Sequence, residues 1–251
     1  MAHIAVLGLG NWGTAIARLW LLEGHKVKGW TIEQEVYESI TMSEVNQKYL
    51  PHHPVKGLDA TMHLNEAIDG SEIIVLAVPS SVILDVMEDV LPHLQPGHVL
   101  LDLAKGLAPG KRLISEAIHT RLKEEGKSNP LAVLTGPTIA PEAAGGVMTT
   151  ALVASEDQAI AQRLAQTLST PSFILHPASD PVGAELWGAY KNVVALACGL
   201  VDGLKHVGDL GGDNLKAAIF MSGFKEGCLL LAELGARAEV AFGPAGLGDM
   251  Y

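Results

Sequence analysis

Short apolar runs alternate with helix-like patterns through the first 180 residues of this chain. The runs are almost uninterrupted, which is typical of strands buried on both faces of a parallel sheet, and the segments between them repeat apolar residues at helical spacing. The pattern predicts strands at residues 4–7, 26–30, 73–78, 98–103, 131–135, 150–154 and 172–175, and helices at 14–22, 36–43, 84–91, 112–124 and 157–168. We therefore expect one sheet with helices on both faces.

The pattern becomes entirely helical after Asp180. Helices are expected at residues 182–204 and 214–234, on either side of a glycine-rich break at 208–212. Asp213 is expected to cap the second helix, because aspartate is favoured at that position. We place a domain boundary near Ser179, with an α/β domain at residues 1–179 and an all-helical domain at 180–251.

The first expected strand runs directly into a glycine turn and then a helix. Gly8 permits a tight turn, Gly10 lets the backbone approach a pyrophosphate, and Gly13 lets the helix pack close to the strand. Asn11 and Trp12 belong to the turn, and the free N–H groups and dipole of the helix that follows favour phosphate. The order predicts a dinucleotide site in a Rossmann-like, doubly wound, mostly parallel sheet, with a structural glycine loop as the alternative.

The composition and net charge limit the kinds of partner that the chain can bind. Apolar residues make up 48% of the 251 residues and charged residues only 18%, which indicates a large core or an oligomer interface, so a homodimer is one expected assembly. The net charge of −11 argues against nucleic acid or an anionic membrane as a partner. A small anionic substrate would need a local cluster of basic residues.

A few residues indicate the cellular compartment and whether a metal site is expected. Cys198 and Cys228 lie in apolar helical patterns and are interpreted as core thiols of a reducing compartment. The start of the chain does not resemble a signal peptide, and no apolar run is long enough to span a bilayer, so a cytoplasmic protein without membrane insertion is expected. His52 and His53 are interpreted as loop residues, and no metal site is expected.

An acidic residue about 20 positions after the glycine turn binds the ribose of NAD in such folds. Glu33 falls near that distance, although it could equally begin the next helix. No arginine lies there to receive the 2′-phosphate of NADP, which favours NAD slightly. Both NAD and NADP stay open as cofactors.

Two lysines attract attention. Lys105 follows an expected strand, at the sheet edge where ligands bind in open α/β folds, although a solvated loop lysine is the plain alternative. Lys191 lies among apolar residues of a long expected helix. Either its stem packs in the core with its ammonium in water, or it faces a cleft where partial desolvation makes it a usable proton donor and acceptor.

Nine motifs in order resemble the NAD(P)-dependent glycerol-3-phosphate dehydrogenase family over the whole chain. They begin at Gly8, Tyr49, Val78, Lys105, Gly136, Gly183, Lys191, Gly212 and Gly246, and read GLGNWGTA, YLP, VPS, KG, GPTIAPE, GAE, KNV, GDN and GLGD. The resemblance implies hydride transfer between NAD(P)H and dihydroxyacetone phosphate, giving sn-glycerol 3-phosphate for phospholipid synthesis.

The resemblance also implies residue roles. Gly8, Gly10, Asn11, Trp12, Gly13, Pro79, Lys105 and Ala140 would bind the cofactor, and Lys105, Gly136, Thr138, Lys191, Asn192 and Asp249 the substrate. Lys191 would transfer the proton, with Lys105 and Asp249 beside it in the catalytic set. Because the family continues beyond this motif into an arginine segment that grips phosphate, the helical domain is expected to be truncated relative to the family. Another two-domain dehydrogenase acting on 3-hydroxy acids, and a non-catalytic dinucleotide-binding protein, are the alternatives.

Overall fold

The protein is described from a computed structural model, for residues 1–207 and 211–250. Its strands form a single sheet in the order β3-β2-β1-β4-β5-β6-β7-β8. Their bounds are β1 His3–Leu7, β2 Lys26–Trp30, β3 Asp59–Thr61, β4 Ile73–Leu76, β5 Val99–Asp102, β6 Leu131–Thr135, β7 Thr149–Ala154 and β8 Phe173–Ala178. Neighbouring strands are parallel except for the antiparallel pair β6 and β7. From β1 the chain adds β2 and β3 toward one edge of the sheet, and it then adds β4 to β8 toward the other edge. The strand order therefore reverses between β1 and β4, although these two strands are parallel.

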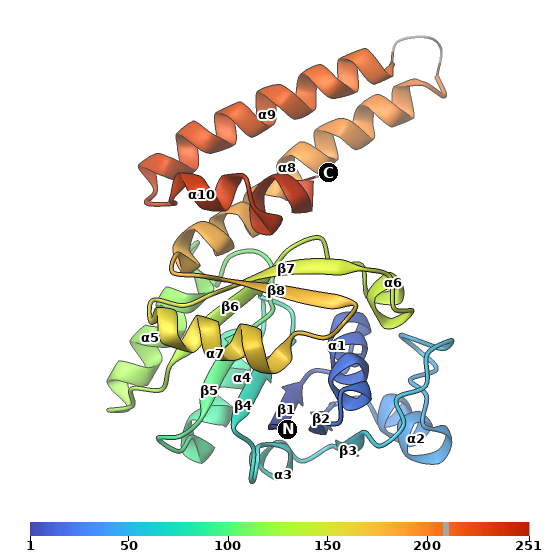
Figure 1. The fold of residues 1–251 in the computed structure, drawn as a ribbon, viewed down its shortest axis with the longest axis vertical. Helices are drawn as coiled ribbons and strands as arrows, with labels where there is room; N and C mark the ends of the chain where they lie inside the picture. The colour runs from blue at the N-terminus through green and yellow to red at the C-terminus, as the bar shows by residue number, and fades with distance from the viewer. Residues whose placement is uncertain (208–210, 251) are drawn as a thin grey trace.

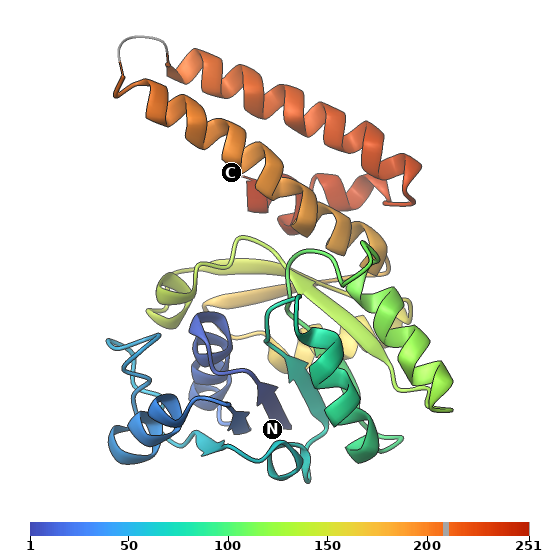
Figure 2. The same ribbon diagram turned by 180° about the vertical axis from the view of Figure 1, so that it is seen from behind.

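Helices cover both faces of this sheet (Figures 1 and 2). One core layer holds α1, α2 and α7 against the sheet, and the other holds α3, α4 and α5. The bounds are α1 Asn11–Leu22, α2 Gln34–Ser43, α3 Leu64–Ile68, α4 Ile83–Val90, a 3₁₀ turn Leu91–His93, α5 Ile114–Glu124, α6 Ala140–Ala144 and α7 Gln158–Leu168. The doubly wound fold predicted from the pattern is confirmed.

The helical part stands at the β7 side of the sheet (Figure 1). It comprises α8 Pro181–Leu204, α9 Asp213–Glu233, α10 Ala238–Ala241 and a π-helical turn, η2, at Pro244–Gly248. The long helices α8 and α9 lie side by side in both views (Figures 1 and 2). The two helices make an aromatic contact, in which the ring centroids of Trp187 and Phe224 lie 5.5 Å apart. The Tyr190 hydroxyl also donates a hydrogen bond to the Gly223 carbonyl at 2.8 Å.

Several local predictions differ from the structure. The short elements β3, α3, α6 and α10 were not expected, because three to five residues carry too little periodicity to detect. Asp213 does not cap α9: the helix begins at Asp213 itself, whose carboxylate pairs instead with Lys205. Residues 208–210 of the expected glycine-rich break lie outside the described residues.

The structure describes both cysteines and the lengths of the helices. Cys198 is buried and Cys228 is half-buried, and both thiols are free. Within residues 1–207 and 211–250, no helix combines the length and the apolar character that a bilayer crossing requires.

Candidate active site

The glycine turn between β1 and α1 has the shape its sequence predicts. Gly8 has a φ of 107°, which favours glycine, and its N–H donates to the Trp30 carbonyl at 2.9 Å. A Cβ on Gly13 would lie 1.9 Å from the Gly8 carbonyl oxygen, so only glycine lets α1 start this close to β1. A Cβ on Gly10 would meet nothing within 4 Å, because that position faces open space. The turn therefore brings bare backbone to an open surface.

Asn46 fixes this turn from a distant loop. Its side-chain amide donates to the Leu9 carbonyl and to the Thr14 hydroxyl, both at 2.8 Å, and the residue is fully buried. The sequence offered no sign of this role, since Asn46 lies 37 residues from Leu9. The backbone that would face a phosphate is thus preorganised.

A cavity of about 700 Å³ opens over the turn at the carboxyl ends of the central strands. Its lining comprises Gly8, Leu9, Gly10, Asn11, Trp12, Trp30, Thr31, Ile32, Glu33, Tyr49, Ala77, Val78, Pro79, Val82, Val86, Leu103, Ala104 and Lys105. The cavity lies where the strand order reverses between β1 and β4, the usual ligand position in doubly wound folds.

The cavity fits a dinucleotide. The first turn of α1 has no acidic residue and no side-chain cap, so its N–H groups are free for a pyrophosphate. Trp30, Val82 and Val86 supply apolar wall on which flat rings can pack.

Two lysines meet on one carboxylate beside this cavity. The Lys105 Nζ lies 3.0 Å from Asp249 Oδ2, and the Lys191 ammonium pairs with Asp249 Oδ1. Lys105 follows β5, Lys191 lies in α8, and Asp249 directly follows η2, so three distant segments contribute. The Asp249 side chain is 3% exposed and that of Lys191 15%, whereas that of Lys105 is 31% exposed. Lys105 lines the cavity, which places this lysine cluster at its rim.

Burial lowers the pKa of Lys105 to about 8. Desolvation is the main cause; the Lys191 ammonium lowers the pKa further, and the Asp249 carboxylate partly opposes both. Near neutral pH the cluster therefore holds an ammonium that loses its proton more readily than an ordinary lysine.

The other residues expected in the site have different surroundings. The Gly136 carbonyl accepts from Lys105 Nζ at 3.0 Å and from the Thr138 hydroxyl at 3.1 Å, so both residues lie beside the lysine cluster. Pro79 lines the cavity. Ala140 packs in a small buried group with Ala15 and Leu50, against which Trp12 also packs. Asn192 is exposed on α8, next to Lys191 in sequence.

Glu185, which ends the GAE motif, joins α8 to the sheet domain. Its carboxylate accepts from the Ser115 N–H at 3.0 Å and from the Ser115 hydroxyl, and so caps the start of α5. The residue is 5% exposed, and burial raises its pKa. Further along α8, a Cβ on Gly188 would lie 3.2 Å from Thr135 Oγ1, so the helix passes close to the end of β6. These contacts position the α8 turn that carries Lys191.

Asp102 supports the loop that carries Lys105. It ends β5 with no exposed surface, and its Oδ1 accepts from the Ala104 N–H at 2.8 Å. Burial raises the pKa of this carboxyl well above its usual range. In the sequence, the sign of this supporting role was an acidic residue, Asp102, at the end of an apolar strand.

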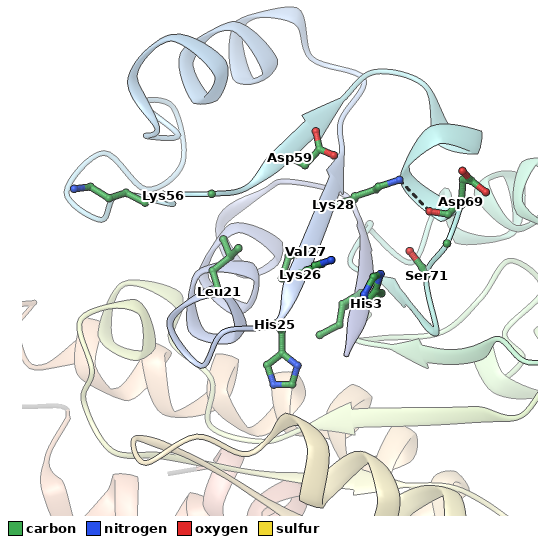
Figure 3. A pocket seen from close by; sticks show the side chains of 13 residues that line it. His3, Leu21, His25, Lys26, Val27, Lys28, Lys56, Asp59, Asp69 and Ser71 are labelled. Atoms are coloured by element: carbon green, nitrogen blue, oxygen red, sulfur yellow. Dashed lines mark hydrogen bonds between the residues drawn. The ribbon is translucent and has the colours of Figure 1, made fainter. Parts of the chain in front are cut away.

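A second cavity, of about 560 Å³, lies at the opposite edge of the sheet (Figure 3). Lys26, Lys28 and Lys56 line it together with Asp59 and Asp69, so opposite charges nearly balance. The Lys28 ammonium is already bound to the backbone carbonyls of Glu66 and Asp69, at 3.0 and 2.9 Å. This cavity lies at the amino ends of β1 and β2, away from the glycine turn, and we assign the site to the carboxyl edge.

A doubly wound sheet with a dinucleotide-sized cavity at its switch point and lysines at the cavity rim is typical of nicotinamide-dependent dehydrogenases. Models of the NAD-dependent glycerol-3-phosphate dehydrogenase N-terminus and C-terminus match residues 3–161 and 180–251. The chain belongs to this family.

Individual relatives agree with the family models. A glycerol-3-phosphate dehydrogenase (NAD(P)+) of Rhodospirillum rubrum is 39% identical over 250 residues, covering 99% of this chain and 69% of the relative. The corresponding enzyme of Fusobacterium nucleatum is 34% identical over 252 residues, covering 100% of this chain and 73% of the relative. The crystal structure of glycerol-3-phosphate dehydrogenase from Coxiella burnetii superimposes with a TM-score of 0.89 at 33% identity, covering 99% of this chain and 74% of that one.

Proposed function

We propose that this chain reduces dihydroxyacetone phosphate to sn-glycerol 3-phosphate with NADH or NADPH, and catalyses the reverse oxidation. Family membership supports the reaction. The single observation that carries the proposal is the pairing of Lys105 and Lys191 with Asp249 beside the cavity. A cluster with two ammonium groups in a chain of net charge −11 is suited to a small anionic substrate with a reducible carbonyl.

Cofactor binding would use the glycine turn. We assign the pyrophosphate to the backbone of Gly8, Gly10, Asn11, Trp12 and Gly13, where α1 offers free N–H groups. Pro79 and Lys105 would border the nicotinamide end. Ala140 would act more indirectly, because it packs behind Trp12.

A bound reduced nicotinamide supplies the hydride that adds to the C2 carbonyl carbon of the substrate. We assign the matching proton to Lys191, whose ammonium would polarise the carbonyl oxygen and then protonate it, so that the carbonyl becomes an alcohol. Asp249 would hold the Lys191 ammonium in place, and Lys105 would offset negative charge on the substrate. Gly136 and Thr138 would border the substrate through their contacts with Lys105 and with each other, and Asn192 would approach it from α8.

The test is oxidation of NADH and of NADPH by the purified chain with dihydroxyacetone phosphate, monitored by absorbance. We expect turnover that depends on this substrate. Reduction of NAD by 3-hydroxy acids, without turnover of dihydroxyacetone phosphate, would favour the other kind of dehydrogenase. Nucleotide binding with no turnover at high substrate concentration would indicate a non-catalytic binding protein.

Organisation and assembly complete the proposal. We propose a dinucleotide-binding domain at residues 1–179 and a substrate domain at 180–251, working in the cytoplasm, where the free thiols of Cys198 and Cys228 would stay reduced. We also propose a homodimer. Light scattering on the wild type tests it: a dimeric mass supports the proposal, and a monomeric wild type contradicts it.

A further inference from the structure

A lysine contacts the lining of the cofactor cavity, through Glu33, from a part of the chain where no cation was expected. The loop after β2 lines the cavity with Thr31, Ile32 and Glu33. The Lys48 Nζ lies 2.5 Å from Glu33 Oε2, and the Tyr49 hydroxyl donates to Glu33 Oε1 at 2.8 Å. Lys48 also pairs with Glu35, in the first turn of α2. Both carboxylate oxygens of Glu33 are therefore engaged by residues that follow 15 and 16 positions later.

The position of this cluster gives it chemical meaning. In doubly wound folds an acidic residue after the second strand accepts the ribose 2′-hydroxyl of NAD, and a nearby cation accommodates the 2′-phosphate of NADP. Here Glu33 stands in the first role and Lys48 in the second, while the neighbouring Ile32 is uncharged and 75% exposed. Glu33, Glu35 and Lys48 together carry a net charge of −1, from two carboxylates and one ammonium.

This charge balance acts differently on the two cofactors. A ribose hydroxyl can donate to Glu33 and adds no charge. A 2′-phosphate brings negative charge next to two carboxylates and can gain only by attracting Lys48 away from them. Lys48 and Glu35 are both absent from the cavity lining among the described residues. Lys48 would therefore reach a 2′-phosphate only by moving away from the carboxylates, and Glu35, whose side chain is 64% exposed, would oppose this by holding Lys48.

We propose that Glu33, Glu35 and Lys48 set the cofactor preference of this enzyme: Glu33 favours NADH, Lys48 permits NADPH, and Glu35 limits NADPH by holding Lys48. The inference rests on the proposed function in one respect, the placement of the adenosine ribose beside the β2 loop. Lys48 determines the preference from 15 positions after Glu33, so the residues directly after β2 do not reveal it.

A purely structural role is the competing explanation. Glu33 and Glu35 lie at the N-terminus of α2, where acidic residues stabilise a helix, and Lys48 could simply tie that helix to the following loop. The two explanations differ in one respect. A structural role changes stability and affects both cofactors equally, whereas a discriminating role changes the ratio of their affinities.

The experiment measures binding of ADP-ribose and of 2′-phospho-ADP-ribose by calorimetry, so that no turnover is needed. We expect the wild type to bind ADP-ribose more tightly. Lys48→Met should weaken binding of 2′-phospho-ADP-ribose by about fivefold while changing binding of ADP-ribose by less than about twofold, the range for one partly exposed ionic contact. Glu35→Gln should tighten 2′-phospho-ADP-ribose by about threefold.

Glu38→Gln is the matched control. It removes the same charge from the same helix, but its carboxylate contacts Gln34 rather than Lys48, and it should leave both affinities unchanged. Equal effects of Lys48→Met on the two ligands, or no effect on either, would overturn the proposal. Failure of the wild type to bind ADP-ribose would overturn the cofactor site and the proposal with it. If the ratio shifts as expected but dihydroxyacetone phosphate is not reduced, the proposed reaction fails and the discriminator stands.

Discussion

The two ends of the site, the glycine turn at the cofactor end and the lysine cluster at the substrate end, are built in different ways. The glycine turn is local: strand, turn and helix follow one another within residues 3–22, and the contact between Gly13 and Gly8 spans five positions. The lysine cluster is assembled from far apart, with 58 residues between Lys191 and Asp249 and 144 between Lys105 and Asp249. The cofactor end should therefore depend on backbone shape, and the substrate end on how α8 and η2 dock against the sheet.

Removing the shared carboxylate should have the largest effect. Asp249→Asn leaves two ammonium groups close together without their counter-ion, and we expect kcat/KM for dihydroxyacetone phosphate to fall by roughly 100-fold or more. Affinity for ADP-ribose should change little, because Asp249 belongs to the other end of the site. Asp202→Asn, which removes an exposed ion pair with Lys216, is the control and should be nearly silent. A parallel loss of nucleotide binding would show that the two ends are not separable.

Gly13→Ala should break the cofactor end. The added methyl would lie 1.9 Å from a backbone oxygen that cannot easily move, so we expect about 3 kcal/mol of lost stability and loss of ADP-ribose binding. Gly10→Ala adds the same methyl into open space and should weaken only ligand binding, with the free energy of unfolding nearly unchanged. Denaturant titration with calorimetry separates the two. If both variants unfold alike, the close approach of α1 to β1 does not matter.

Glu185→Gln tests the docking of α8. Its amide can still accept from one Ser115 donor but turns an N–H group toward the other, which should cost about 1–2 kcal/mol of stability. Because Lys191 lies six residues further along the same helix, kcat should fall while ADP-ribose affinity holds. Asp157→Ala, which removes the side-chain cap of α7, is the control and should lose about 1 kcal/mol of stability without losing kcat. An unchanged kcat in Glu185→Gln would leave Glu185 with a structural role alone.

Within one pH unit, the smallest effect is the decline on the alkaline side of the pH profile. Because burial lowers the pKa of Lys105 to about 8, kcat/KM for dihydroxyacetone phosphate should decline above that pH, by up to tenfold per unit. The folded chain also binds fewer protons than the unfolded chain between about pH 8 and 10.5, so this group makes stability rise with pH across that window. Lys105→Arg should shift this decline to higher pH. A flat profile to pH 10 in the wild type would contradict the role of the Lys105 charge.

The same contrast explains what the sequence could predict. The turn at Gly8, Gly10 and Gly13 could be predicted because its parts are adjacent, and the long strands and helices because each carries a full period of its pattern. The antiparallel pairing of β6 and β7 could not, since periodicity does not encode strand direction. Lys48 and Asn46 were missed because they act on residues 15 and 37 positions earlier. Asp249 emerged only through resemblance, since nothing local marks an aspartate that joins two distant lysines.

The central claim is that Lys105 and Lys191 act as one unit through Asp249, and a double-mutant cycle tests it most directly. The measurement is kcat/KM for dihydroxyacetone phosphate in Lys105→Met, Lys191→Met and the double variant, with ADP-ribose affinity measured for each. We predict a severe loss in Lys191→Met, retained nucleotide affinity, and a double variant little worse than the poorer single variant, because residues that act as a unit are not additive. Losses that multiply in the double variant, or full activity in Lys191→Met, would contradict the claim.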